Sequence, residues 1–99
     1  MTVVVTVLID APPSVVAKVE SDNPDIFDKI MGPAEKYVTA HRRLLGEASV
    51  MDIDEFASME DHDAFVAEAA EGIELYGKAL GVTLTGTLWE LEDTPLPDA

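Results

Sequence analysis

The residues best suited to chemistry in this 99-residue chain lie in one short segment, from Ala40 to Phe56. A histidine beside a carboxylate can act as a general base that its partner orients, and an arginine can hold an oxyanion. Histidine is also the side chain that exchanges a proton near neutral pH without a large perturbation. The segment therefore predicts a catalytic site built on His41, Arg43 and Asp52. The alternative is a structural cluster of cross-strand ion pairs.

A β-hairpin is what would bring these residues together. Gly46-Glu47 is the predicted turn between two runs of strand composition. A two-residue turn there places His41 opposite Asp52 and Arg43 opposite Val50. Alternate strand residues point to the same face, and a shift of one residue in the pairing would disperse them. The face so defined holds His41, Arg43, Asp52, Asp54 and Phe56.

A pocket, if the fold has one, is expected between a helical layer and the sheet. Tyr76, Tyr37 and Trp89 combine an apolar ring with a polar tip, which suits a ligand-binding wall, although core packing is the alternative for each. We expect Tyr76 on the helical wall and Trp89 on the sheet. The predicted ligand-binding residues are Asp54, Phe56, Tyr76 and Trp89.

The sequence does not favour a metal site. The chain has no cysteine, which excludes disulfides and sulfur-ligated zinc. His62 stands between Asp61 and Asp63, but neighbours one residue apart on a helix point in different directions and cannot converge on one ion. Asp52 and Asp54 could meet a divalent ion together with His41, yet oxygen-rich sites need more ligands. We therefore expect no metal.

Four strands and two helices would position these residues. Residues 2–9 are apolar at nearly every position, and residues 39–45 and 48–56 form the hairpin. Asn23-Pro24 is a helix start, Gly32-Pro33 predicts a kink or two short helices, and Ser58 is placed to cap the second helix, which ends at Gly81. Residues 10–22 are expected to be loop-like at their ends, at Pro12-Pro13 and Ser21-Asp22, around a short apolar patch over residues 15–17. The predicted strands are 2–9, 39–45, 48–56 and 82–91, and the predicted helices are 24–41 and 59–80.

The order is β-α-β-β-α-β, a ferredoxin-like α+β fold with a four-stranded antiparallel sheet. Right-handed crossovers would place both helices on one face of that sheet. In the first strand Val3, Val5 and Val7 alternate with Val4 and Leu8, so both faces are apolar. Burying apolar surface is worth about 25 cal/mol per Å², which favours covering the second face with another copy. We expect a homodimer formed through sheet faces.

Composition limits the classes of function. The chain is 47% apolar, and its formal net charge of −14 is uneven: residues 1–49 carry seven acids and five bases (−2), and residues 50–99 carry thirteen acids and one base (−12). Such a field repels phosphates, so nucleic acid and anionic membranes are poor partners. No apolar run approaches the roughly 18 residues of a membrane span, and no leader pattern precedes Val3. We expect a cytoplasmic protein with one domain over residues 1–91 and a loose tail over 92–99.

Short motifs indicate a family. His41-Arg42-Arg43, the Asp54-Glu55-Phe56 triplet, Ser58 with Glu60, Ala64-Phe65 and the Ala79-Leu80-Gly81-Val82 junction resemble small uncharacterised members of the dimeric α+β barrel superfamily. That superfamily includes antibiotic-biosynthesis-type monooxygenases, isomerases, haem-degrading enzymes and proteins without known chemistry. The resemblance implies chemistry that needs no metal or flavin. The haem-degrading branch fits poorly, because the only asparagine, Asn23, sits at a helix start.

Two functions remain open. The first is a cofactor-independent monooxygenase- or isomerase-like enzyme that acts on a small apolar or aromatic molecule. The second is a non-catalytic homodimer that binds a small ligand or only assembles. A cavity of about 300 Å³ or more with convergent polar groups would favour the enzyme.

Overall fold

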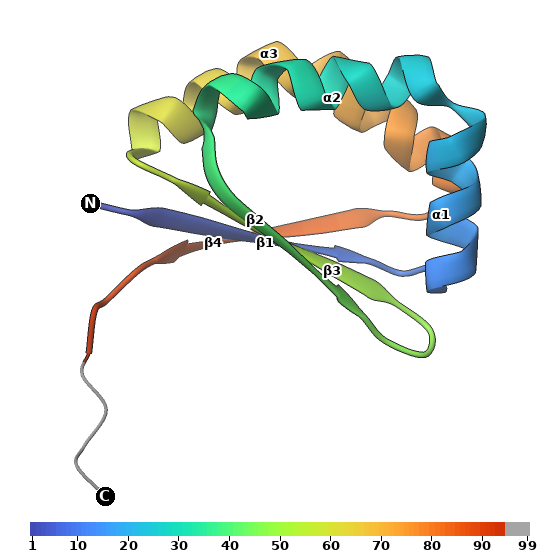
Figure 1. Ribbon diagram of the computed structural model, residues 1–99, viewed down its shortest axis with the longest axis horizontal. Helices are drawn as coiled ribbons and strands as arrows, with labels where there is room; N and C mark the ends of the chain where they lie inside the picture. Colours follow the sequence, from blue (N-terminus) through green and yellow to red (C-terminus); the bar gives the residue numbers. More distant parts are fainter. Residues whose placement is uncertain (95–99) are drawn as a thin grey trace, which may run out of the picture.

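A computed structural model of the chain describes residues 1–94 and contains one antiparallel sheet and three helices (Figure 1). The strands are β1 (Val3–Ile9), β2 (Val38–Leu45), β3 (Val50–Phe56) and β4 (Leu84–Glu90). The helices are α1 (Pro13–Asp22), α2 (Pro24–Tyr37) and α3 (Met59–Leu80). The chain is thus α+β, as predicted, with one helix more than the sequence suggested.

The sheet has the strand order β2-β3-β1-β4, in which β1 pairs antiparallel with both β3 and β4. Both long helices, α2 and α3, lie on one face of the sheet, and α1 stands at one end of this layer (Figure 1). This is the ferredoxin-like arrangement that the order of elements predicted. It leaves the opposite face of the sheet, hereafter the outer face, without a covering helix.

The alternation in β1 determines which residues reach each face. Val3 and Ile9 are buried beneath the helices, and Val5 and Val7 pack beside them. The residues between them point to the outer face. Val3, Val5 and Val7 therefore belong to the face that the helices cover. The outer face of β1 consists of Val4, Thr6 and Leu8.

Helix α3 begins and ends where its sequence predicts. The backbone N–H of Asp61 donates to the Ser58 hydroxyl oxygen over 3.1 Å, which satisfies one of the free N–H groups of the first turn. Gly81 ends the helix with a φ of 73°, a left-handed conformation that favours glycine. Both caps were predicted and are confirmed.

No helix was predicted in residues 10–22, yet α1 occupies most of this segment, and the expected loop-like end at Ser21-Asp22 is helical. Pro13, in the other expected loop-like end, is the first residue of α1, where a missing N–H group does no harm. Val16 anchors the helix in the core. Asn23 does not cap α2 with its side chain; its Nδ2 donates instead to the carbonyl of Val19 near the end of α1, over 2.8 Å.

Helix α2 also differs from its prediction. It runs through Pro33 as a single helix rather than two short ones, and it ends at Tyr37 instead of residue 41. Val38 and His41 continue the helical spacing of apolar positions, but they belong to β2. Hydrogen bonding to β3 takes precedence over helical periodicity in this stretch.

The helices pack against each other and on the sheet around two adjacent apolar clusters. One contains Ile9, Val16, Val50, Tyr76 and Leu80 beside Ala11, and the other contains Val3, Phe56, Phe65 and Ala69. Helix α3 meets α2 at Gly72, where an added Cβ would lie 2.9 Å from a side-chain carbon of Ile30 and 2.9 Å from Cβ of Lys29. The two helices approach so closely because this position has no side chain.

The last described residues, 92–94, have no regular secondary structure, and the remainder of the predicted tail, residues 95–99, lies outside the described part. Among residues 1–94, none of the helices has the length and apolar character needed to cross a bilayer.

Candidate functional site

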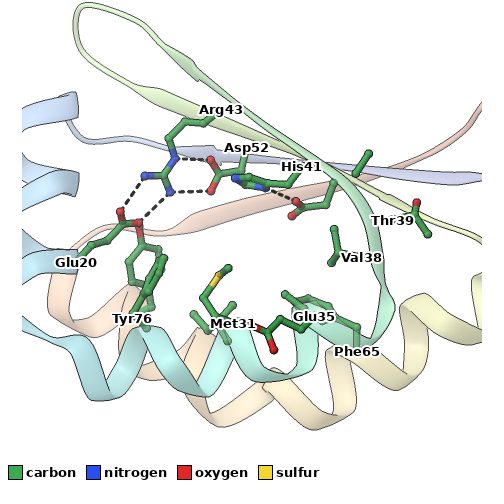
Figure 2. A pocket seen from close by; sticks show the side chains of 15 residues that line it. Glu20, Met31, Glu35, Val38, Thr39, His41, Arg43, Asp52, Phe65 and Tyr76 are labelled. Atoms are coloured by element: carbon green, nitrogen blue, oxygen red, sulfur yellow. Dashed lines mark hydrogen bonds and ion pairs between the residues drawn. The ribbon is translucent and has the colours of Figure 1, made fainter.

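A cavity of about 550 Å³ lies between α2 and the strands β2 and β3 (Figure 2). Apolar side chains form most of its wall, and polar groups come from the hairpin and from all three helices. The apolar lining consists of Phe27, Ile30, Met31, Ala34, Val38, Ala40 and Phe65. The polar lining consists of Glu20, Glu35, Thr39, His41, Arg43, Asp52, Asp54 and Tyr76.

The hairpin brings His41 to Asp54 rather than to Asp52. The turn between β2 and β3 has four residues, Gly46 to Ser49, closed by a hydrogen bond from the Gly46 N–H to the Ser49 carbonyl over 2.9 Å. His41 is therefore opposite Asp54, and Arg43 is opposite Asp52. The predicted register is wrong by two residues. Because two is the period of a strand, the predicted set of side chains still shares one face.

The His41–Asp54 pair is the part of the site best suited to proton transfer. His41 Nδ1 lies 2.5 Å from Asp54 Oδ1, and a carboxylate only accepts, so Nδ1–H donates and Nε2 keeps its lone pair. The His41 side chain is 52% exposed and the Asp54 side chain 19%. Burial raises the pKa of the Asp54 carboxyl above its usual range, although the hydrogen bond from His41 acts in the opposite direction. Nε2 has no hydrogen-bond partner among residues 1–94.

Arg43 lies in the middle of a second group, the Arg43 cluster, formed by Glu20, Arg43, Asp52 and Tyr76 (Figure 2). Its guanidinium donates to both oxygens of Asp52, over 2.6 and 3.1 Å, and to both oxygens of Glu20, over 2.9 and 2.8 Å. These two carboxylates use four of its five N–H groups. The expectation that Arg43 holds a substrate oxyanion is not supported, because its charge is already compensated.

Tyr76 completes the cluster from α3. Its hydroxyl donates to Glu20 Oε2 over 2.6 Å. Burial raises the pKa of the Tyr76 hydroxyl, and its hydrogen bond to Glu20 adds to the effect. Burial alone would also raise the pKa of the Glu20 carboxyl, but hydrogen bonds from Arg43 and Tyr76 outweigh it and hold that pKa below its usual range. At neutral pH the cluster thus carries two negative charges and one positive.

Two predicted ligand-binding residues lie elsewhere. Trp89 is on the outer face, where its indole N–H donates to the Thr6 hydroxyl oxygen over 2.9 Å, so its expected place in the pocket is wrong. Phe56 shares the hairpin face but is buried in the core, edge-on to His62 and tilted against Phe65. Asp54 and Tyr76 do line the cavity.

Sequence reasoning missed Glu20, Met31 and Glu35. Glu20 lies on α1, the helix that was not predicted, although Val15, Val16 and Val19 recur there at helical spacing after Pro13. Met31 and Glu35 are on exposed positions of α2 that nothing in the sequence singles out. Within the described residues no group of three or more His, Asp or Glu side chains is arranged to hold a metal ion.

No family model and no curated protein matches this chain. Solved structures do match its fold. Rv0793 from Mycobacterium tuberculosis has a TM-score of 0.68 and 14% identity, and the match covers 95% of this chain and 98% of that one. An antibiotic biosynthesis monooxygenase has a TM-score of 0.65 and 12% identity, with 92% and 99% covered. A dimeric ferredoxin-like protein from an uncultured marine organism has a TM-score of 0.67 and 9% identity, with 98% and 93% covered.

These likenesses establish the fold. The chain has the ferredoxin-like fold of the antibiotic biosynthesis monooxygenase and of the dimeric ferredoxin-like protein, which is the fold that the predicted order of elements implied.

Proposed function

We propose that this protein is an enzyme that binds a small apolar or aromatic molecule in the cavity and removes a proton from it, with His41 as the base. Proton removal is the step that cofactor-independent monooxygenase-like and isomerase-like reactions can share. The observation that carries the proposal is the His41–Asp54 pair, whose two residues line a mostly apolar cavity of about 550 Å³. A cavity of this size falls in the range of small-molecule sites.

The two residues would divide the work as a base and its orienting group. Nε2 of His41 takes the proton from the bound molecule, and the ring becomes an imidazolium. Asp54 holds the ring through Nδ1 and stabilises the positive charge that develops, as a carboxylate does beside a catalytic histidine. The apolar wall would hold the body of the bound molecule beside the base. General base catalysis of this kind contributes about 10²–10⁴ in rate.

A second function, that of a non-catalytic ligand-binding module, is favoured by the hydrogen bonds that already occupy Arg43. Proton removal leaves an anion, and enzymes stabilise such anions with hydrogen-bond donors placed near the developing charge. The guanidinium of Arg43 is engaged by Glu20 and Asp52, and the Tyr76 hydroxyl already donates to Glu20. A binding module needs no anion stabilisation.

Deuterium exchange separates the two functions. Molecules from a library of small apolar and aromatic compounds that bind, as judged by NMR, are incubated with the protein in D2O, and the loss of each C–H signal is followed. The enzyme exchanges an acidic C–H of at least one ligand. His41→Gln, which keeps a polar side chain but provides no base, should lower that exchange by about 10²–10⁴ while the ligand still binds.

The matched control is His62→Gln, which removes the other histidine of the chain, on α3 and outside the cavity lining. Its exchange rate should equal that of the wild type. Binding without exchange in the wild-type protein supports the binding module. Exchange that survives in His41→Gln contradicts the assignment of the base.

We further propose that two copies associate through their outer faces. The outer face carries Val4, Leu8, Leu44, Met51, Ile53 and Trp89, of which Leu8, Leu44 and Trp89 are exposed. Of the 26 charged residues in the chain, β1–β4 bring only Arg42 and Glu55 to this face, so association does not bring its acids together there. The neighbour described as a dimeric ferredoxin-like protein supports the association of two copies.

A pair of substitutions matched in exposure tests the assembly. Leu8, on the outer face, is 39% exposed, and Val66, on α3, is 42% exposed. Leu8→Asp should lower the mass found by light scattering to that of one 10.7 kDa chain, whereas Val66→Asp should leave it at twice that value. A wild-type protein that is monomeric at micromolar concentration contradicts the proposal.

A further inference from the structure

The charges around the cavity are unbalanced. Four carboxylates line it, from Glu20, Glu35, Asp52 and Asp54, against the single guanidinium of Arg43. With His41 neutral and Tyr76 protonated, four negative charges and one positive charge give the lining a net charge of −3. The chain as a whole is acidic, but here the charge surrounds a space that a small molecule can occupy.

The single fixed cation of the lining is not available to a ligand. Arg43 makes two hydrogen bonds to each of two carboxylates, which leaves one N–H group of its five. A carboxylate or phosphate entering the cavity would meet no free positive charge and would lie close to several negative ones. Like charges held together in a partly desolvated site repel strongly, so anionic ligands are disfavoured.

Asp54, in contrast, has one carboxylate oxygen that is available to a ligand. Its Oδ1 accepts from His41, and its Oδ2 has no hydrogen-bond partner among residues 1–94. No fully buried side-chain oxygen in that part of the chain lacks a partner, so Oδ2 is not fully buried, and Asp54 is one of the residues that line the cavity. Burial raises the pKa of this carboxyl because its negative charge is incompletely compensated. A donor that carries positive charge would supply that compensation.

We propose that the cavity selects molecules that combine an apolar or aromatic body with a positively charged nitrogen, and that the nitrogen donates to Asp54. The body would lie against the wall formed by Phe27, Ile30, Met31, Ala34, Val38 and Phe65. Glu35, exposed on α2 in the cavity lining, adds attraction from the other side. This inference rests on the proposed function, since it names the class of ligand for the same cavity.

Three probes that share one ring system test the selection. 2-(2-Naphthyl)ethylamine is a cation at pH 7, 2-(2-naphthyl)ethanol is neutral, and 2-naphthylacetate is an anion. Affinities are measured by calorimetry or NMR titration with the full chain. The amine should bind at least about tenfold more tightly than the alcohol, as expected for a charge-assisted hydrogen bond in a partly buried site, and the anion should bind most weakly.

Variants locate the effect. Asp54→Asn should bring the affinity for the amine down to that for the alcohol. Asp63→Asn, which changes the net charge equally at a side chain that is 67% exposed and outside the cavity, should keep the preference. Glu35→Gln, at an exposed position that the fold does not depend on, should reduce the preference several-fold and serves if Asp54→Asn does not fold.

The outcomes distinguish this inference from the proposed function. Equal binding of amine and alcohol, tighter binding of the anion, or no binding of the amine overturns the charge selection. The proposed function survives each of those results if deuterium exchange occurs on another ligand, because that exchange depends on His41 and not on the charge of the ligand. A preference for the amine that Asp63→Asn abolishes as completely as Asp54→Asn also overturns the inference, since net charge alone would then explain it.

Discussion

The close contact between α2 and α3 predicts opposite effects for two glycine-to-alanine substitutions in the same helix. At Gly72 an added Cβ would lie 2.9 Å from Cγ1 of Ile30, 2.9 Å from Cβ of Lys29 and 3.2 Å from the backbone carbonyl carbon of Lys29. At Gly77 the nearest atoms belong to Val82 and Leu84 and are 3.8–3.9 Å away, which is ordinary contact. Gly77 therefore serves as the control for Gly72.

The magnitudes follow from two effects. Replacing glycine by alanine inside a helix stabilises a protein by about 0.5–1 kcal/mol, because alanine loses less backbone entropy on folding. Gly77→Ala should show this gain. Forcing an extra methyl group into a packed interface costs about 1–3 kcal/mol, and the carbonyl carbon of Lys29 can give way only if α2 itself moves. Gly72→Ala should therefore be less stable than Gly77→Ala by about 1–3 kcal/mol.

Urea unfolding followed by circular dichroism measures the difference. All proteins are compared at one concentration, because association would make their stability depend on it. The m-values should agree, so that the midpoints report stability alone. If Gly72→Ala is stabilised as much as Gly77→Ala, the helices do not meet at Gly72 as described, and the position of α2 over the cavity would be in doubt as well.

Three further predictions concern the cap of α3 and the carboxylates of the cavity. Ser58→Ala should lower the free energy of unfolding by about 1 kcal/mol, because the Asp61 N–H loses its acceptor; an unchanged urea midpoint would contradict the cap. Glu20→Gln should lower it by about 1–3 kcal/mol at pH 7, since the carboxylate loses its charge opposite Arg43. Folding lowers the pKa of Glu20, so the ionised carboxylate stabilises the protein above the usual carboxyl range, and this stabilisation is lost as the pH falls through the pKa of the folded state. The difference in unfolding free energy between Glu20→Gln and wild type should therefore shrink in acid, and a difference that does not change with pH would refute the ion pair with Arg43. Folding raises the pKa of Asp54, so its ionisation lowers the stability of the protein as the pH rises through the pKa of the folded state. Asp54→Asn should therefore be at least as stable as wild type at pH 7. A clearly lower free energy of unfolding for Asp54→Asn in urea would show instead that this carboxylate stabilises the fold.

Strong local signals made much of the fold predictable. The strand of residues 2–9 is apolar almost throughout, and Ser58 and Gly81 define both ends of α3. The unpredicted helix α1 begins at Pro13, in a Pro-Pro pair whose composition suits a turn as well as a helix start. The end of α2 was misplaced because Val38 and His41 fit a helical period, and only pairing with β3 assigns them to a strand.

The site was predicted less completely, for reasons of register and distance along the chain. Strand alternation was enough to group His41, Arg43 and Asp52 on one face. Their partners depend on the length of the turn, and Ser49 closes a loop of four residues where two were expected. Glu20 is 23 residues from Arg43 in sequence, so nothing local indicates that contact. The face on which Trp89 lies depends on the pairing of β4 with β1, and threonines on alternate positions of β4 leave its two faces hard to tell apart.

The Arg43 cluster also limits how long a ligand can be. It stands at the end of the cavity nearest α1, and Tyr76 belongs both to the cavity lining and to the packed core beyond it, with Val16 and Val50 (Figure 2). A ligand in the cavity can extend toward α1 only until it reaches the Arg43 cluster, which forms a partition there. Removing Arg43 to lengthen the space would leave the carboxylates of Glu20 and Asp52 without their cation, which is strongly destabilising in a partly buried site. The length of a small molecule, and not only its polarity, is thus a property by which this cavity can discriminate among ligands.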